Sequence, residues 1–267
     1  MTTLDLPVSA GGKPALDIAI HAARQAGDII RSHFHSEKCV SYKEGRSNIV
    51  TDVDLLAEKC IIDLLQQNYP GFGIMAEESP ATAGELPYTW IIDPIDGTRN
   101  YAFGIPHFCV CIALAHGEEV VLGVIYDPMR DELFRAEKGC GAFLDDMPVA
   151  VTDKTSLSVS LVSFDLGYDA DVGQKMLGVT SALWPGVVSV RVMGSAALGL
   201  AYVACSRLDL YFHFSLYPWD LAAGILLVRE AGGVVTEFEG QPIGLNSRTV
   251  VASNRAIHRE FTRKVIR

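Results

Sequence analysis

Apolar residues near the N-terminus recur at steps of three and four, which is the spacing of one face of an amphipathic helix. The pattern predicts helices over residues 14–36 and 51–68, joined by a polar loop at 43–48. Pro70 and Gly71 are expected to end the second helix, because proline lacks the backbone donor that a helix needs and glycine favours a turn.

Continuous apolar runs then replace the helical spacing, which indicates buried strands. They predict short strands at 72–76 and 89–92, and a hairpin region over 108–134 that turns at 116–119 and at 127–128.

A polar stretch at 145–158 precedes a second half in which strands and helices alternate, a pattern typical of α/β architecture. The expected strands are 159–163, 187–190, 208–212, 234–236 and 250–252. The expected helices are 169–182, 195–206, 219–231 and 256–265. We therefore expect an α+β domain over residues 1–150 and an α/β domain over residues 151–267.

Composition and charge narrow the class of protein. Apolar residues make up 49% of the 267, enough for a large core, and the formal net charge is −10. Such an acidic chain is not expected to bind duplex nucleic acid or an anionic membrane surface. Because we find neither a basic and apolar leader nor an apolar run of about 18 residues, we expect a cytoplasmic protein without a signal peptide or membrane span.

The six cysteines are too sparse for a disulfide scaffold. Cys109 and Cys111 form a close pair, and on a strand both sulfurs would lie on the same face, which suits two core residues. No cluster of cysteine and histidine has the spacing of a zinc site.

Candidate chemistry is concentrated in acidic clusters, of which the clearest is Asp93-Pro94-Ile95-Asp96-Gly97-Thr98. Two carboxylates three residues apart at the end of a strand can converge on one point. Pro94 fixes the backbone there, and Gly97 lets the chain approach a ligand closely. If Gly97 and Thr98 open a helix, their N–H groups would point toward a phosphate. The same six residues also fit a turn with an aspartate cap.

Three further clusters each allow a chemical and a structural interpretation. Glu77 and Glu78 follow a predicted strand, where a buried pair would need a cation and an exposed pair would not. Thr51 and Asp54 have the spacing of a helix-capping box, yet Asp54 could also be a buried base. Asp220 opens a helix, where it either complements the helix dipole or binds a ligand, and the small residues behind it would let that helix pack closely.

Together these clusters form a set of hard oxygen donors with no soft ligand nearby. The set consists of Glu77, Asp93, Asp96 and Asp220. It suits Mg²⁺ or Mn²⁺ better than zinc. Several carboxylates could hold two metals and so stabilise an in-line phosphoryl displacement.

The order of these motifs resembles the inositol monophosphatase family, which belongs to the lithium-sensitive, magnesium-dependent phosphatases together with the fructose-1,6-bisphosphatases. The resemblance covers most of the chain and is carried by Asp54, Glu77-Glu78, the 93–98 motif and Trp219-Asp220-x-x-Ala223. It implies an α/β protein with an α+β N-terminal half, folded as a layered αβαβα sandwich with the site between the halves. It also implies a homodimer.

The resemblance further implies a role for each site residue. Glu77, Asp93 and the Ile95 carbonyl would hold one Mg²⁺, and Asp93, Asp96 and Asp220 a second, with Glu77 reaching a third through water. Thr98, hydrogen-bonded to Asp54, would orient and deprotonate the attacking water, with Glu77 assisting as a catalytic residue. The implied contacts to the substrate are Gly97, Thr98, Lys43, Arg99, Ser195, Ala196 and His213. Lys43 also fits a solvated loop residue.

The expected activity is hydrolysis of inositol monophosphate or a related small polyol or sugar phosphate. His213 stands where inositol-specific members carry a glutamate, and Arg99 stands where many members carry a threonine. His213 would face the leaving group, attracting an anion when protonated, or else pack away from the site. These departures leave open a fructose-1,6-bisphosphatase, a histidinol-phosphatase and a 3′-phosphonucleotide phosphatase. A catalytically silent binding module with the same fold is a further alternative, against which the intact set of carboxylates argues.

Overall fold

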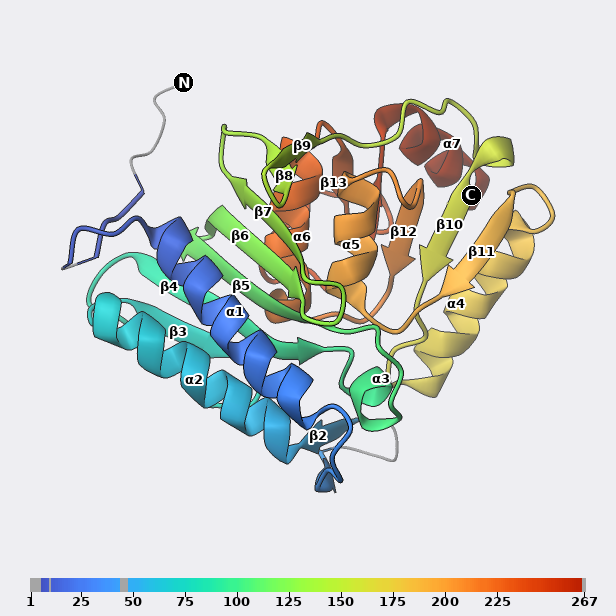
Figure 1. The fold of residues 1–267 in the computed structure, drawn as a ribbon. Helices are drawn as coiled ribbons and strands as arrows, with labels where there is room; N and C mark the ends of the chain where they lie inside the picture. Colours follow the sequence, from blue (N-terminus) through green and yellow to red (C-terminus); the bar gives the residue numbers. More distant parts are fainter. Residues whose placement is uncertain (1–5, 10, 44–47, 266–267) are drawn as a thin grey trace.

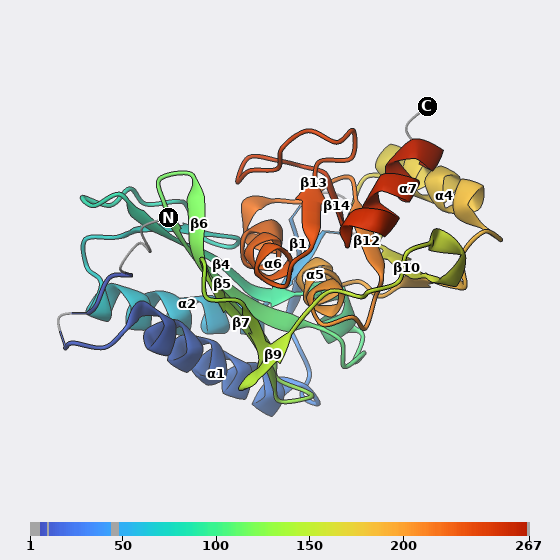
Figure 2. The same ribbon diagram turned by 90° about the horizontal axis from the view of Figure 1, so that it is seen from above.

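Helices and sheets alternate in layers through the molecule, in the order helices, sheet, helices, sheet, helices (Figures 1 and 2). The computed structural model describes residues 6–9, 11–43 and 48–265. Most of the polar loop predicted over 43–48 therefore lies outside the described residues. The arrangement confirms the layered αβαβα sandwich that the motifs implied.

The first sheet has seven strands in chain order, and all neighbours are antiparallel except the first two. Its strands are β3 (Gly73–Ala76), β4 (Tyr88–Asp96), β5 (Cys109–His116), β6 (Glu119–Asp127), β7 (Glu132–Glu137), β8 (Ala142–Leu144) and β9 (Met147–Val149). Helices α1 (Ala15–His33) and α2 (Asp52–Asn68) cover one face (Figure 1). A small pair, β1 (Val40–Tyr42) and β2 (Ile49–Thr51), leads into α2.

Strand β5 shows why the strands of the first sheet do not alternate between apolar and polar residues. Val110 and Ile112 pack toward α1 and α2, whereas Cys109, Cys111 and Ala113 pack on the opposite side, in the cluster that joins the two sheets. Because both faces of the sheet are covered by helices, alternation gives way to a continuous apolar run. The two cysteine sulfurs are buried 3.9 Å apart, which confirms that both side chains share one face of a strand.

The second sheet has five strands in the order β11-β10-β12-β14-β13. They are β10 (Leu161–Phe164), β11 (Ser189–Val192), β12 (Leu210–His213), β13 (Val234–Thr236) and β14 (Val250–Ser253). Helices α4 (Ala170–Leu183) and α7 (Arg255–Val265) cover its outer face, where Phe164, Phe212 and Phe261 are fully or almost fully buried.

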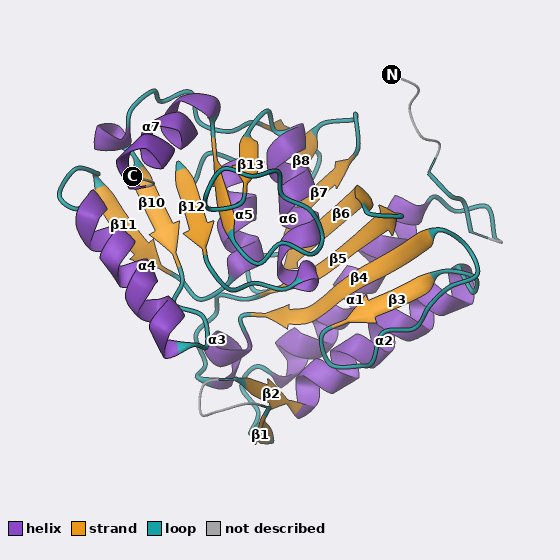
Figure 3. Cartoon of the chain, turned by 180° about the vertical axis from the view of Figure 1, so that it is seen from behind, coloured by secondary structure: helices purple, strands orange, loops and turns teal. Residues whose placement is uncertain are grey.

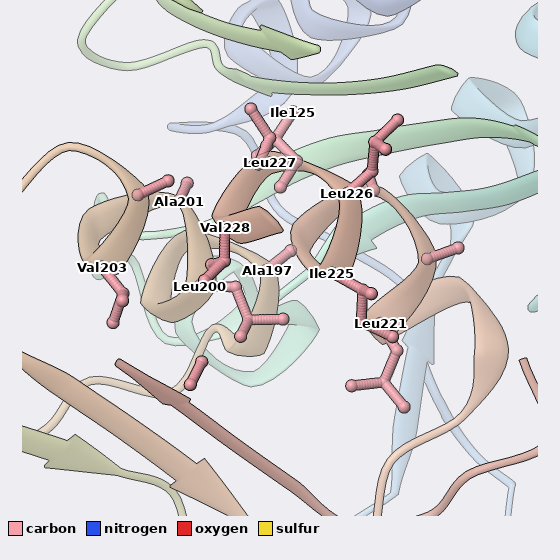
Figure 4. Close-up of a cluster of buried hydrophobic side chains, with 14 of the residues drawn as sticks. Ile125, Ala197, Leu200, Ala201, Val203, Leu221, Ile225, Leu226, Leu227 and Val228 are labelled. Atoms are coloured by element: carbon pink, nitrogen blue, oxygen red, sulfur yellow. The ribbon is translucent and has the colours of Figure 1, made fainter. Parts of the chain in front are cut away.

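Helices α5 (Ala196–Ala204) and α6 (Pro218–Glu230) form the central layer between the two sheets (Figure 3). Figure 4 shows side chains of both helices, Leu200 and Leu227 among them, packed together with Ile125 of the first sheet. A methyl group on Gly224 would lie 2.4 Å from Leu200 Cδ1. The small residues behind Asp220 therefore do let α6 approach its neighbour closely, as predicted.

The predicted elements of the second half all form, with small shifts at their ends. The largest shift is at the strand predicted over 187–190, which forms two residues later as β11. The strand predicted over 159–163 begins at Leu161, because Leu157–Val159 form a 3-10 turn (η1) capped by Ser156. Strands β1, β2, β8 and β9 were not predicted.

The boundary predicted near residue 150 coincides with a change of sheet, because β9 ends at Val149 and β10 begins at Leu161. The two halves nevertheless share one buried cluster around α5 and α6. Among the described helices, none is both long and apolar enough to cross a membrane.

Candidate active site

A cavity of about 270 Å³ opens where the first sheet, α5, α6 and β12 meet. It is lined by most of the predicted site residues, namely Lys43, Glu77, Asp93, Ile95, Asp96, Gly97, Thr98, Arg99, Ala196, His213 and Asp220. Asp54 and Ser195 lie behind this lining, since Asp54 contacts Thr98 and Ser195 contacts Asp96. Residues from both halves of the chain thus converge on one pocket.

Three carboxylates form the centre of the cavity. Asp93, Asp96 and Asp220 each offer an oxygen, and these oxygens all lie within 4.8 Å of one another. A register shift in β4 between Asp93 and Asp96 turns both side chains toward α6, which begins two residues before Asp220. Glu77 joins them because β3 and β4 are parallel, so the chain leaves both strands at the same edge of the sheet.

The electrostatics of this cluster favour a bound cation. Burial, and then repulsion by Glu77 and Asp96, raises the pKa of Asp93 well above its usual range. Burial and the charges of Asp96 and Glu77 raise the pKa of Asp220 as well. Charged carboxylates this close are stabilised when hard cations bind between them, and an all-oxygen donor set is the kind that Mg²⁺ prefers. The residues present therefore fit the metal that the motifs implied.

Asp96 also connects the two halves of the molecule. Its carboxylate accepts hydrogen bonds from the Ser195 hydroxyl at 2.5 Å, the Ala197 amide at 2.7 Å and the Ala196 amide at 3.2 Å. Ser195 caps α5 through the same hydroxyl and is 1% exposed. These bonds partly offset the effect of burial, which raises the pKa of Asp96 to about 6.

Asp54 combines the two roles that its sequence position allowed. Its Oδ2 accepts hydrogen bonds from the backbone N–H and the hydroxyl of Thr51, which completes a capping box at the start of α2. Its Oδ1 lies 3.1 Å from the hydroxyl oxygen of Thr98, which is also 3.0 Å from the Ile95 carbonyl. Thr98 has one proton to donate, so Asp54 is its acceptor whenever the Ile95 carbonyl has another partner. Burial raises the pKa of Asp54 to about 6.

Lys43 supplies the cation that a buried Glu77-Glu78 pair requires. Its ammonium lies 2.9 Å from Glu77 Oε1 and 2.5 Å from Glu78 Oε1. Burial alone would lower the pKa of Lys43, but the two carboxylates outweigh it and the pKa is raised. Burial and then Glu77 raise the pKa of Glu78 to about 7. Lys43 is thus an ion-paired residue at the cavity wall and not a solvated loop residue.

Gly97 allows the backbone to turn between the carboxylates and Thr98. Its φ of +104° lies in the region that favours glycine. A Cβ at this position would lie 3.1 Å from the carbonyl oxygens of both Gly194 and His107. The predicted close approach at Gly97 is therefore to these two carbonyls as well as to the cavity.

His213 and Arg99 both line the cavity. Burial, followed by the nearby Arg99 charge, lowers the pKa of His213 to about 4. At pH 7 the ring is therefore in its neutral form, which has one hydrogen-bond donor and one acceptor. Its Nδ1 accepts a hydrogen bond from the Ser215 amide at 3.0 Å, so Nε2 carries the proton.

Asp165 and Asn100 are site residues that the sequence interpretation missed. Asp165 Oδ1 accepts hydrogen bonds from the amides of Met193 (2.8 Å) and Gly194 (2.6 Å), and Oδ2 from the Tyr211 hydroxyl (2.9 Å). Asn100 donates to the Met193 carbonyl at 2.7 Å. Together they fix the turn that precedes α5 at the cavity. The available signal for Asp165 was a carboxylate just after a predicted strand, the same context as Glu77.

Glu58 is a third residue that the sequence interpretation missed, and it has no signal in the sequence. Its carboxylate accepts hydrogen bonds from the Glu78 amide at 2.8 Å and from the Ser79 hydroxyl. It is 2% exposed on α2. Glu58 therefore holds the segment after β3, which includes Glu77, against helix α2.

Comparison with known proteins agrees with this geometry. The inositol monophosphatase family matches residues 13–267. "Nus factor SuhB" of Xylella fastidiosa is 41% identical over 85% of this chain and 83% of its own length. "Inositol monophosphatase 3" of Solanum lycopersicum is 38% identical over 92% of this chain and 94% of its own.

Solved structures match the fold closely. The extragenic suppressor protein suhB of Bartonella henselae superposes with a TM-score of 0.89 at 37% identity, over 93% of this chain and 97% of its own. The inositol monophosphatase of Anabaena superposes with a TM-score of 0.84 at 36% identity, over 94% of both chains. The match of sequence and fold over nearly the whole chain shows that it belongs to the inositol monophosphatase family.

Proposed function

We propose that the protein is a Mg²⁺-dependent phosphomonoesterase that hydrolyses inositol monophosphate or a related small polyol or sugar phosphate. One observation carries the proposal: the carboxylate oxygens of Asp93, Asp96 and Asp220 lie within 4.8 Å of one another, in the same cavity as a threonine hydroxyl backed by a buried carboxylate. A non-catalytic protein has no need to hold such mutually repelling groups together.

Two or three Mg²⁺ ions, or Mn²⁺ in their place, are assigned to this cluster. Glu77, Asp93 and the Ile95 carbonyl would hold one, and Asp93, Asp96 and Asp220 another. Lys43 contacts Oε1 of Glu77, which leaves Oε2 for a cation. When bound, such ions make a water molecule more acidic and neutralise charge on the phosphoryl group.

Thr98 and Asp54 are assigned to the proton that the attacking water loses. The Thr98 hydroxyl donates to Asp54 Oδ1, and its oxygen is free to accept a hydrogen bond from a water in the cavity. A proton can then pass from the water to the Thr98 oxygen while the threonine proton passes to Asp54. A pKa of about 6 suits Asp54 to this role, because the carboxylate is ionised at pH 7 and still basic enough to accept a proton.

Phosphate release with Mg²⁺ present tests the proposal directly. The panel should contain inositol monophosphates, fructose 1,6-bisphosphate, histidinol phosphate and 3′-phosphonucleotides. We expect turnover of at least one compound, silenced by EDTA and restored by Mg²⁺. Full turnover in EDTA, or no release from any compound, would refute it.

A catalytically silent binding protein is the second candidate, because several relatives carry the name "Nus factor SuhB". The same assay decides between the two.

We further propose a cytoplasmic homodimer that millimolar lithium inhibits. The exposed Phe103 (79%), Ile105 (50%) and Val192 (56%) near the turn held by Asn100 support a self-contact, which light scattering would test.

A further inference from the structure

Arg99 places a positive charge in a cavity whose other charged groups are mostly carboxylates. It follows Thr98 directly, in the first turn of α3 (Thr98–Ala102), and reaches across to the second half of the chain. One guanidinium nitrogen donates to the Gly167 carbonyl at 3.2 Å, and the group lies over the Tyr168 ring with its carbon 4.7 Å from the ring centre. A carbonyl and an aromatic face thus hold the guanidinium in one orientation.

Among the ion pairs formed by the described residues, none includes Arg99. Asp165 is a nearby carboxylate in the cavity wall, but its oxygens already accept hydrogen bonds from Met193, Gly194 and Tyr211. Arginine has five N–H donors in a planar fork, and within the part of the chain that the structure describes one of them is used, by the Gly167 carbonyl. The remaining donors suit the two oxygens of a carboxylate or phosphate.

His213 adds a second donor on the same side of the cavity. A Cβ on Gly167 would lie 3.7 Å from His213 Nε2, so the imidazole edge is next to the residue that holds Arg99. Because Nδ1 accepts from the Ser215 amide, the neutral ring presents an N–H at Nε2. This part of the wall therefore offers hydrogen-bond donors and a positive charge.

We propose that Arg99 and His213 bind a second anionic group of the substrate, so that the enzyme prefers a phosphomonoester carrying another phosphate or a carboxylate. The inference rests on the proposed phosphatase function. It places the scissile phosphate at the carboxylate cluster and the second anion at the part of the wall formed by Arg99 and His213. Histidinol phosphate fits poorly, since its ammonium group would meet Arg99, and a neutral polyol would leave the guanidinium without an anionic partner.

Two matched pairs of compounds test the preference. They are fructose 1,6-bisphosphate against fructose 1-phosphate, and inositol 1,4-bisphosphate against inositol 1-phosphate. For each pair the ratio of kcat/KM, bisphosphate over monophosphate, is measured with excess Mg²⁺. We expect a ratio of about ten or more for at least one pair in the wild type, as one charge-assisted hydrogen bond supplies.

Arg99→Gln removes the charge and should lower that ratio by about tenfold to a hundredfold, mainly through KM for the bisphosphate. Arg99→Lys keeps the charge without the planar fork and should give an intermediate ratio. Arg31→Gln is the matched control, because Arg31 lies on α1 and pairs with Asp28 at the surface. It should leave the ratio unchanged, and circular dichroism shows whether each variant is folded.

A wild-type ratio of one or less for both pairs would overturn the inference, as would the same ratio in wild type and a folded Arg99→Gln. If no compound releases phosphate, the proposed function fails instead. In that case the same compounds are titrated into wild type and into Arg99→Gln in a calorimeter. Equal affinities of the two proteins for the bisphosphates would refute the anion site.

Discussion

Replacing Asp54 by asparagine separates the structural role of this residue from its chemical one. Asparagine keeps an acceptor for the Thr51 amide and is a good capping residue, so the start of α2 should survive. Its second polar atom becomes an NH₂ group, which cannot accept the proton of Thr98. The change therefore removes the base and leaves the helix cap.

Asp54→Asn should also change the unfolding free energy, because the Asp54 carboxyl is buried and its pKa is shifted. Burial raises that pKa from 3.8 to about 6, which corresponds to about 3 kcal/mol against the charged form in the folded protein. The folded state thus binds a proton that the unfolded state has lost between these pH values, and stability falls as the pH rises through this window. An asparagine side chain carries no charge and escapes the penalty. The difference in unfolding free energy between Asp54→Asn and wild type should therefore shift in favour of the variant by up to about 3 kcal/mol from pH 4 to pH 8.

Catalysis should respond in the opposite direction. Loss of a general base costs roughly 10²–10⁴ in kcat. Urea unfolding at both pH values, in EDTA, measures the stability, and phosphate release with Mg²⁺ measures kcat. Asp52→Asn is the control, because Asp52 is exposed in the same helical turn and bonds only the Cys39 amide among the described residues. A variant with near wild-type kcat and reduced stability would show that capping is the whole role of Asp54.

Further predictions concern the metal cluster, pH and packing. Asp93→Asn should abolish phosphate release, whereas Glu78→Gln should reduce it less, because Asp93 is assigned to two metals and Glu78 is paired with a lysine; equal losses would contradict that assignment. Activity should fall as the pH drops through about 6, where Asp54 gains a proton, and a pH–rate profile with no acid limb near 6 would argue against it. Gly224→Ala should lower the unfolding free energy by about 1–3 kcal/mol, because the methyl group overlaps Leu200, and an unchanged Tm by calorimetry would disprove that tight contact.

The sequence by itself predicted the helices of the first half and the main acidic motif. The apolar spacing predicted α1 and α2 to within three residues at each end, because each of these helices buries a single face against one sheet. The 93–98 motif identified Asp93 and Asp96 without any knowledge of their surroundings, since a strand end, a proline and a glycine within six residues define their own backbone path. Residue types close together in the chain determine such features through short-range sterics and hydrogen bonds.

The tertiary structure decided everything that depends on burial and on distant partners. Lys43 proved to be the cation for Glu77 and Glu78, more than 30 residues away, and burial made His213 a neutral donor. Asp165 had no local motif, because its partners at 193, 194 and 211 are brought to it only by the second sheet and the turn before α5. Charge state and hydrogen-bond pairing follow from desolvation and convergence in space, neither of which is encoded by the spacing of residues along the chain.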